Sequence, residues 1–571
     1  MQNTRSLRRL IFALSLLSAC AASGAVGSSV VRASPLSGVA AGSYGAYLAG
    51  RFAESQDDFA YAATELLAAQ RANAGNTELL SQAFLACLLD GRPEAESLAA
   101  QLPNSPAAQL LLADQDVAAG RWGSAERRYR DVPREGLTQL VQPLLIAWAQ
   151  QGAGRTEAAL ATLQPLSEGQ RFRGIYALHA ALIADLAGRN ADAARLYRVA
   201  QTDFGGTNLR LAQIVASWQE RQGDASEARQ TIESMRQGDQ EFSIAVPALM
   251  ARDNERPVAN ATEGIAEAYL ALAASLREQE RSEFPLVLLR LALNLRPDFT
   301  AARLLMADAF DAGKHPALAL SALAPVANSD PLYSLVQLRR AGLDQQSGDT
   351  DAATRTLERL AQEIPSSPEP LAQLGDIMRT KSRFAEAISA YDRAIERVAQ
   401  PSRADWPLFY ARGIAHDRAH QWDQAEADLE HALRLSPDEP YVLNYLGYSW
   451  AEQGRELSRA RQMIEKAAEL RPNDGAIIDS MGWVLMRQGD GAAAVHWLER
   501  AVELEPEDPT INAHLGDAYW AIGRKLQAEF QWRRALNLNP EPDDQAKLQA
   551  KLHEAASDPA TVPATAARQL P

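Results

Sequence analysis

Cysteine and lysine are both scarce in this chain of 571 residues. The only two cysteines are Cys20 and Cys87, so at most one disulfide can form and a disulfide framework cannot hold the fold. Lysine accounts for only six of the 57 basic residues, and none precedes Lys314. An anion-binding site in the first half of the chain would therefore have to be built from arginine.

Positive charge is also in the minority. The 57 Lys and Arg residues face 72 Asp and Glu residues, which gives a formal net charge of -15. This sign is wrong for neutralising phosphates, so we expect neither nucleic acid nor an anionic lipid surface as a partner. With 47% hydrophobic and 23% charged residues, and only 34 Gly and 29 Pro, the composition is that of a folded protein with a large interior.

The first 19 residues have the layout of a bacterial secretory signal. Three arginines and no acid precede the apolar stretch 10–19, which is too short to span a hydrocarbon core. The stretch ends in Leu17-Ser18-Ala19-Cys20, which resembles a lipobox, the motif at which Cys20 becomes the acylated first residue. We therefore predict a lipoprotein signal peptide over 1–19, lipidation of Cys20 and a flexible tether over 20–42.

Two other interpretations of the amino terminus stay open. Ordinary signal-peptide cleavage after Val31-Arg32-Ala33 would release a soluble periplasmic protein. A retained membrane anchor is the third, although Ser and Gly dilute the uncharged stretch 10–31 and would weaken its insertion. In every interpretation the body lies outside the cytoplasm, and with a lipid anchor the outer membrane is the expected location.

A 34-residue period runs through the body of the chain. Three residue types share this interval: Pro472, Pro506 and Pro540; Ala467, Ala501 and Ala535; and Gly482 with Gly516. This period is typical of a repeat built from two antiparallel helices. Small residues let the two helices approach closely, and proline marks where a helix must stop.

The period predicts about 14 helical units in two arrays. We expect an N-terminal array over 43–235, an irregular helical connector over 236–265 and a C-terminal array over 266–542. A charged capping helix over 543–556 would cover the last face of the array, and a disordered tail would follow over 557–571. The register is clearest from Trp406 onward.

The repeat signatures resemble those of the tetratricopeptide repeat (TPR) family. They are 443–448 (Leu-Asn-Tyr-Leu-Gly-Tyr), 478–483 (Ile-Asp-Ser-Met-Gly-Trp) and 514–520 (His-Leu-Gly-Asp-Ala-Tyr-Trp). The resemblance implies an all-α superhelical solenoid and extends to long proteobacterial TPR envelope lipoproteins. One of these is the adaptor of a periplasmic carboxyl-terminal processing protease.

The sequence lacks the common catalytic and nucleotide-binding motifs. It contains no Walker-type loop, dinucleotide fingerprint, HExxH or Gly-x-Ser-x-Gly element, and the non-repeat segment 236–265 is too short for a catalytic domain. His416 and His420 have metal-ligand spacing, but His416 occupies a packed repeat position and His420 falls in a turn. We therefore predict no catalytic residue, no cofactor, no metal site and no small-molecule substrate.

A candidate partner groove follows from the repeat register. In this architecture the first helix of each pair lines the concave face through its second, fifth, ninth, twelfth and thirteenth positions. In the three best-defined units these positions include Tyr441, Asn444, Tyr448, Asp479, Trp483, Met486, Arg487, Asp517 and Trp520. Aromatic anchors inside a polar rim are typical of protein recognition, while the alternative is that these rings pack against the neighbouring helix.

Together these features favour a non-catalytic periplasmic scaffold or adaptor lipoprotein. Its expected partners are envelope proteins or peptides, possible clients of a protease among them, and its lipid anchor would lie in the membrane. An accessory protein of secretion or polysaccharide export would have the same sequence features. So would a soluble periplasmic TPR protein formed by ordinary signal-peptide cleavage.

Overall fold

The computed structural model describes residues 43–133, 138–169, 172–204, 208–234, 240–251, 255–276 and 284–557. The predicted signal peptide 1–19, Cys20, the tether and all of the tail beyond Ser557 lie outside these residues, so those predictions stay predictions. Every regular element in the described residues is helical. No helix among them combines the length and the apolar character needed to cross a membrane.

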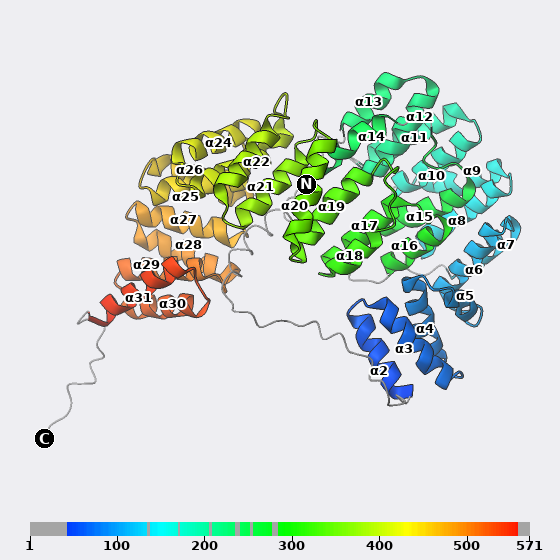
Figure 1. The fold of residues 1–571 in the computed structure, drawn as a ribbon, viewed down its shortest axis with the longest axis horizontal. Coiled ribbons are helices and arrows are strands. Elements are labelled where there is room, and N and C mark those ends of the chain that lie inside the picture. The colour runs from blue at the N-terminus through cyan, green and yellow to red at the C-terminus, as the bar shows by residue number, and fades with distance from the viewer. Residues whose placement is uncertain are drawn as a thin grey trace. The chain divides into compact units, whose positions relative to one another are not determined.

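The chain divides into two compact units (Figure 1), here called the N-terminal unit (35–377) and the C-terminal unit (378–571). The helices of the N-terminal unit are α2 (Ser43–Ser55), α3 (Phe59–Ala72), α4 (Thr77–Asp90), α5 (Glu94–Ala99), α6 (Pro106–Ala118), α7 (Trp122–Asp131), α8 (Thr138–Gly152), α9 (Thr156–Ser167), α10 (Arg173–Leu186), α11 (Asn190–Phe204), α12 (Leu209–Gln222), α13 (Ala225–Glu233), η3 (Gln240–Ala245), α14 (Val246–Met250), α15 (Ala261–Leu276), α16 (Phe284–Leu295), α17 (Thr300–Ala312), α18 (Pro316–Leu323), α19 (Tyr333–Gln346) and α20 (Thr350–Glu363). The boundary between the units falls inside α21 (Glu369–Thr380).

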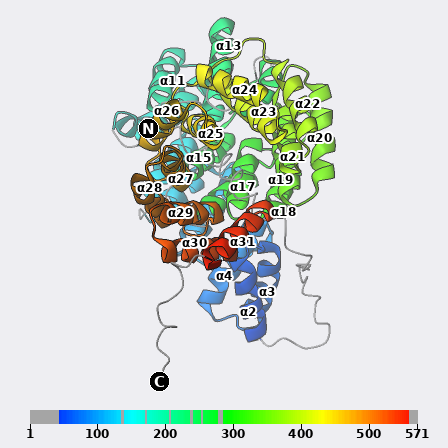
Figure 2. The ribbon, with the colours of Figure 1, turned by 90° about the vertical axis from the view of Figure 1, so that its left-hand side faces the viewer.

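The C-terminal unit continues the same pattern of helix pairs. Its helices are α22 (Phe384–Ile395), η4 (Arg403–Asp405), α23 (Trp406–Arg418), α24 (Trp422–Leu435), α25 (Pro440–Glu452), α26 (Leu457–Leu470), α27 (Gly475–Arg487), α28 (Gly491–Leu504), α29 (Pro509–Ala521), α30 (Lys525–Asn537) and α31 (Pro542–Ser557). Figure 2 shows α27 to α30 stacked in order, with α31 next to α30. The predicted all-α repeat of helix pairs is confirmed.

Local sequence signals explain where these helices begin and how closely they pack. Asp474 and Asp508 cap α27 and α29 by accepting hydrogen bonds from backbone N–H groups in the first turn. Gly489 has a φ of +86°, a left-handed conformation that glycine adopts without strain, and it lies in the turn between α27 and α28. A Cβ added at Gly482 would lie 2.5 Å from Cγ of Leu498, so only glycine permits this crossing of α27 and α28.

Helices α15 and α16 fold back onto the earlier repeats of the N-terminal unit. Helix α15 packs against α8 and α10, and α16 packs against α4 and α6 (Figure 1). The expected connector, 236–265, therefore lies inside this compact unit. Within it the described residues form η3 and α14, and α15 begins at Ala261 rather than at the expected Ala266.

A cap explains the early start of α15. The side chain of Asn260 accepts a hydrogen bond from the backbone N–H of Glu263 at 3.0 Å. The carboxylate of Glu263 in turn accepts one from the backbone N–H of Ala259 at 2.8 Å. This reciprocal arrangement is close to a capping box, and it fixes the helix start upstream of the repeat register.

Candidate functional site

The predicted members of the candidate partner groove lie on three neighbouring first helices of the C-terminal unit. Its nine residues lie on α25, α27 and α29, and α27 packs against both of the others. Four apolar side chains on these helices are half-buried: Tyr448, Trp483, Met486 and Trp520. They remain partly accessible, as a binding surface requires, but none is fully exposed.

Asp479, expected in the polar rim, is buried against His514. A carboxylate oxygen of Asp479 lies 2.8 Å from Nδ1 of His514, and the ring of Trp483 stacks on the imidazole with centroids 4.1 Å apart. Burial alone would lower the pKa of His514, but the charge and hydrogen bond of Asp479 outweigh it, so the pKa is raised. This cluster joins α27 to α29, and Trp483 is part of it.

The end of the candidate groove is engaged by the chain's own last helix. The ammonium group of Lys551 on α31 donates to both carboxylate oxygens of Asp517 at 2.7 Å. The indole N–H of Trp532 donates to the same carboxylate at 2.9 Å, and Trp520 packs beside Trp532 with centroids 5.3 Å apart. Asp517 therefore holds α31 in place as well as lining the surface.

The remaining polar members of the set have internal contacts or are half-buried. The guanidinium of Arg487 donates to the backbone carbonyls of Ala451 at 3.0 Å and Glu452 at 3.1 Å, which ties α27 to the end of α25. Tyr441 and Asn444 are half-buried on α25. The part of the candidate groove that is left for a partner is thus mainly apolar, around Tyr448 and Met486.

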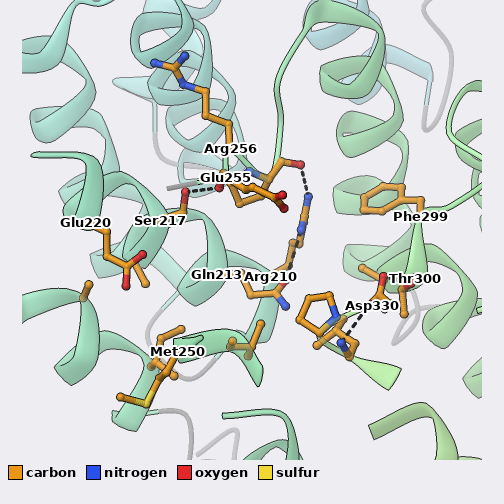
Figure 3. Close-up of a pocket in the computed structure, with 18 of the residues that line it drawn as sticks. Arg210, Gln213, Ser217, Glu220, Met250, Glu255, Arg256, Phe299, Thr300 and Asp330 are labelled. Carbon is orange, nitrogen blue, oxygen red and sulfur yellow. Dashed lines mark hydrogen bonds between the residues drawn. The ribbon is translucent and has the colours of Figure 1, made fainter. Parts of the chain in front are cut away.

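The sequence did not reveal a cavity of about 410 Å³ in the N-terminal unit. Helices α12, α13 and α14 form one wall, and the segments before α15, α17 and α19 form the other (Figure 3). The only sequence signal of this cavity is the loss of repeat register over 236–265. Here α13 is followed by the short helices η3 and α14 instead of a regular helix pair.

Arginine side chains line the cavity, and the structure already uses two of them. The guanidinium of Arg210 donates to both carboxylate oxygens of the buried Glu267 and to the carbonyl of Pro257 at 3.0 Å. Arg296 donates to the same carbonyl at 2.9 Å. Both guanidinium groups lie over the ring of Phe299, at 5.1 and 4.8 Å from its centroid. These arginines hold the walls together.

Neither region has the character of a metal centre. Within the described residues no group of three or more His, Cys, Asp or Glu side chains is arranged to hold a metal ion. Nδ1 of His416 lies 2.7 Å from the side-chain oxygen of Gln421, and His420 occupies a turn with a φ of +60°. The arrangement of both regions suits binding by apolar contact and hydrogen bonding.

A family model matches the second half of the chain. Residues 327–552 match the model described as "Cilia and flagella-associated protein 70 C-terminal domain", whose short name, CFAP70_TPR_C, marks it as a TPR model. Among curated proteins, the chain is 32% identical over 168 residues to "TPR repeat-containing protein PA4667" of Pseudomonas aeruginosa, covering 28% of this chain and 27% of that protein. It is also 30% identical over 89 residues to "Bacteriophage adsorption protein A" of Escherichia coli, covering 16% of this chain and 9% of that protein.

The chain thus matches about a quarter or less of the length of these curated relatives. Among solved structures, the chain is similar to "APC/C hetero-tetramer Cut9-Hcn1", at 14% identity and a TM-score of 0.39, covering 89% of this chain and 95% of that one. It is also similar to YrrB, described as "a TPR protein with an unusual peptide-binding site", at 18% identity and a TM-score of 0.27, covering 34% and 97%. The stacked helix pairs with their 34-residue register have the fold of a TPR solenoid, and the part of the chain from 327 to 552 matches a TPR family model.

Proposed function

We propose that the protein is a non-catalytic adaptor of the bacterial cell envelope that holds other proteins on its repeat surfaces. TPR arrays are scaffolds for binding peptides and proteins. The proposal adds a location: the body lies in the periplasm, attached to the outer membrane by lipid on Cys20. The lipobox-like Leu17-Ser18-Ala19-Cys20 supports this location. Presentation of bound clients to a periplasmic protease is the finer form of the proposal, and it rests on the resemblance of the repeat signatures.

The observation that carries the adaptor role is an apolar stripe on α2. Tyr44, Leu48 and Phe52 are 84%, 66% and 70% exposed, and their spacing of four residues places them on one face of the helix. Single exposed apolar side chains are ordinary, but three in one stripe are typical of an interaction surface.

Comparison with later repeats explains why this face is open. Gly50 approaches Leu66 as Gly516 approaches Trp532, which aligns Leu48 with His514 and Phe52 with Ala518. His514 and Ala518 are buried, and His514 contacts Asp479 of the preceding first helix. Leu48 and Phe52 thus occupy positions that the repeat of α29 uses for packing, and this is the surface on which a partner protein can stack.

Site-specific photo-crosslinking in cells tests the proposal and distinguishes two surfaces. A photoreactive residue at Leu48 probes the α2 stripe, one at Met486 probes the candidate groove, and one at the exposed Gln462 of α26 is the matched control. We expect mass spectrometry to identify a discrete envelope protein crosslinked to Leu48, to Met486 or to both. The control position Gln462 should give no such crosslink. Recovery of no discrete partner from either surface would contradict the adaptor role.

Two double variants then separate binding from packing. With the photoreactive residue at Leu48, the double variant Tyr44→Ser with Phe52→Ser should lose the crosslinked partner while circular dichroism and the unfolding midpoint stay unchanged, because both side chains are exposed. The double variant Trp483→Ala with Trp520→Ala removes rings that are half-buried against His514 and Trp532. Lower stability with unchanged capture would mean that these two rings serve packing only.

A further inference from the structure

A short irregular segment of the chain lies on the inner positions of its own repeats. Residues 240–250 form η3 and α14, and η3 packs against α19. Glu241 lines a small cavity together with Asp308 of α17, Gly342 of α19 and Gln373 of α21. In the repeat register, Asp308 and Gly342 are at the ninth position of their first helices, which lines the concave face. Gln373 is at the sixth position, next to the lining. The segment therefore occupies the kind of surface on which a TPR array holds a peptide.

Polar contacts fix the first half of this segment. A carboxylate oxygen of Glu241 forms an ion pair with the guanidinium of Arg339 on α19 at 2.9 Å. The hydroxyl of Ser243 donates a hydrogen bond to the carboxylate of Glu369 at the start of α21, 126 positions further along the chain. Both contacts join side chains of the segment to the first helices of later repeats, as peptide side chains are held in a groove.

Apolar contacts fix its second half. Ile244, Ala245 and Val246 are buried, and Val246 belongs to an apolar cluster with residues of α12 and α13. Phe242, Leu249 and Met250 pack on the same cluster from its edge. The segment thus contacts α19 and α21 through polar groups, and α12 and α13 through apolar groups.

The packing around the segment is incomplete. A cavity of about 130 Å³ lies beside Glu241, against α17 and α19, and the cavity of about 410 Å³ lies on the side of Leu249 and Met250. A six-residue 3-10 helix followed by a five-residue α-helix replaces the regular helix pair. Voids on both sides lower the free energy that holds the segment in place, because each missing contact forfeits dispersion energy.

We propose that the inner face of α17, α19 and α21 is a peptide-binding surface, and that residues 240–250 are its internal ligand. The external ligand is a peptide with the same chemistry: a carboxylate for Arg339, a hydroxyl two residues later for Glu369, and aliphatic residues after it. Such a peptide displaces the segment. This inference rests on the proposed adaptor function and adds its regulation, since partner binding at this surface requires release of the segment.

The covalent connection of residues 240–250 to the rest of the chain makes this competition strong. A ligand on the same chain acts at an effective concentration of the order of millimolar, so a partner must outcompete it. The apparent affinity of the partner is its intrinsic affinity reduced by the fraction of molecules in which the surface is open. The protein as it stands should therefore bind the external peptide weakly, and loosening the internal ligand should strengthen binding.

A labelled peptide of residues 240–250 is the probe, and fluorescence polarisation with the full chain measures its affinity. We expect the double variant Glu241→Ala with Ser243→Ala to bind the peptide at least about tenfold more tightly than the unchanged protein. Adding Arg339→Ala to that variant should remove most of the gain. The matched control is Arg355→Ala, which replaces an exposed arginine on α20. Equal peptide affinity of the unchanged protein and the double variant would overturn the proposal. So would a peptide affinity that stays the same when Arg339→Ala is added to the double variant.

Hydrogen exchange gives a readout that needs no variant. Excess peptide added to the unchanged protein should speed the exchange of the backbone amides of residues 240–250 by displacing them, while a peptide with scrambled sequence should not. Unchanged exchange at saturating peptide would overturn the internal-ligand assignment even if the double variant failed to fold. A negative result in these peptide experiments does not affect the crosslink expected from Leu48. The internal-ligand proposal and the adaptor proposal can therefore be rejected independently.

Discussion

The hydroxyl of Tyr269 on α15 donates a hydrogen bond to the carboxyl group of Asp114 on α6 at 2.9 Å, across 155 positions of sequence. Tyr129 on α7 donates to the same carboxyl oxygen at 2.5 Å. The three side chains are buried together, so this contact fixes α15 on the earlier repeats. Burial raises the pKa of Asp114 to about 8, against the opposing effect of the two tyrosine hydrogen bonds.

Replacing Asp114 by Asn should make the stability of the protein less dependent on pH. The folded-state pKa of about 8 lies above the ordinary value of 3.8, so the protonated carboxyl stabilises the fold fully below pH 3.8. This stabilisation is lost as pH rises towards 8, at up to about 1.4 kcal/mol per pH unit. Between pH 5.5 and 8.5 the urea midpoint should therefore fall further for the unchanged protein than for Asp114→Asn.

Asp116 on the same helix provides the control for that comparison. Its carboxylate forms ion pairs with Arg121 at 2.7 Å and Arg128 at 2.9 Å. Asp116→Asn should lower the urea midpoint at both pH values, because a neutral amide cannot form the ion pairs with Arg121 and Arg128. If Asp114→Asn and the unchanged protein shift equally with pH, Asp114 is not the titrating group.

Glycine at the helix crossings gives a second prediction. Gly482→Ala should lower the free energy of unfolding by about 1 to 3 kcal/mol, because the new Cβ would meet Leu498 and the backbone carbonyl of Ala494. Gly342→Ala on α19 should instead be neutral or stabilising by up to about 1 kcal/mol, since nothing lies within 4 Å of its Cβ position. Thermal unfolding of both variants checks the contrast, and equal losses would contradict the close-packing explanation.

The repeat register predicted most of the helix starts because each start depends on residues near in sequence. Helices α23, α25, α27 and α29 begin at Trp406, Pro440, Gly475 and Pro509, at intervals of 34, 35 and 34 residues. Local capping also explains the exception, α15, whose cap at Asn260 precedes the register. What one sequence does not encode as a pattern is contact between distant residues, such as Ser243 with Glu369 or Tyr269 with Asp114.

The candidate groove shows the same limit at the level of single residues. The nine residues lie on α25, α27 and α29, but a helical position does not say whether a charged side chain finds a partner. Asp479 meets His514, and Asp517 meets Lys551 of α31, only because the next helix carries a complementary group. The cavity beside α14 escaped prediction for a related reason, since it arises where the repeat is interrupted.

A third prediction concerns the arginine cluster of that cavity. Arg210→Ala should lower the free energy of unfolding by about 3 to 5 kcal/mol, because it leaves the buried carboxylate of Glu267 without its cation. Arg229→Ala on the same cavity wall is the matched control, and it should change stability by less than about 0.5 kcal/mol because Arg229 is exposed. Similar losses of stability in both variants would mean that the Arg210–Glu267 ion pair does not stabilise the fold more than an exposed arginine does.

The two cysteines separate lipidation from packing. Cys20→Ser should abolish labelling by radioactive palmitate and move the protein from the membrane fraction to the soluble fraction, because thioether attachment requires a thiol. Cys87→Ala should leave both properties unchanged. Its thiol is fully buried on α4, and burial raises its pKa to about 11, so it carries little reactive thiolate. Absence of label from the unchanged protein would favour cleavage after Ala33, and label that persists in Cys20→Ser would place the lipid elsewhere.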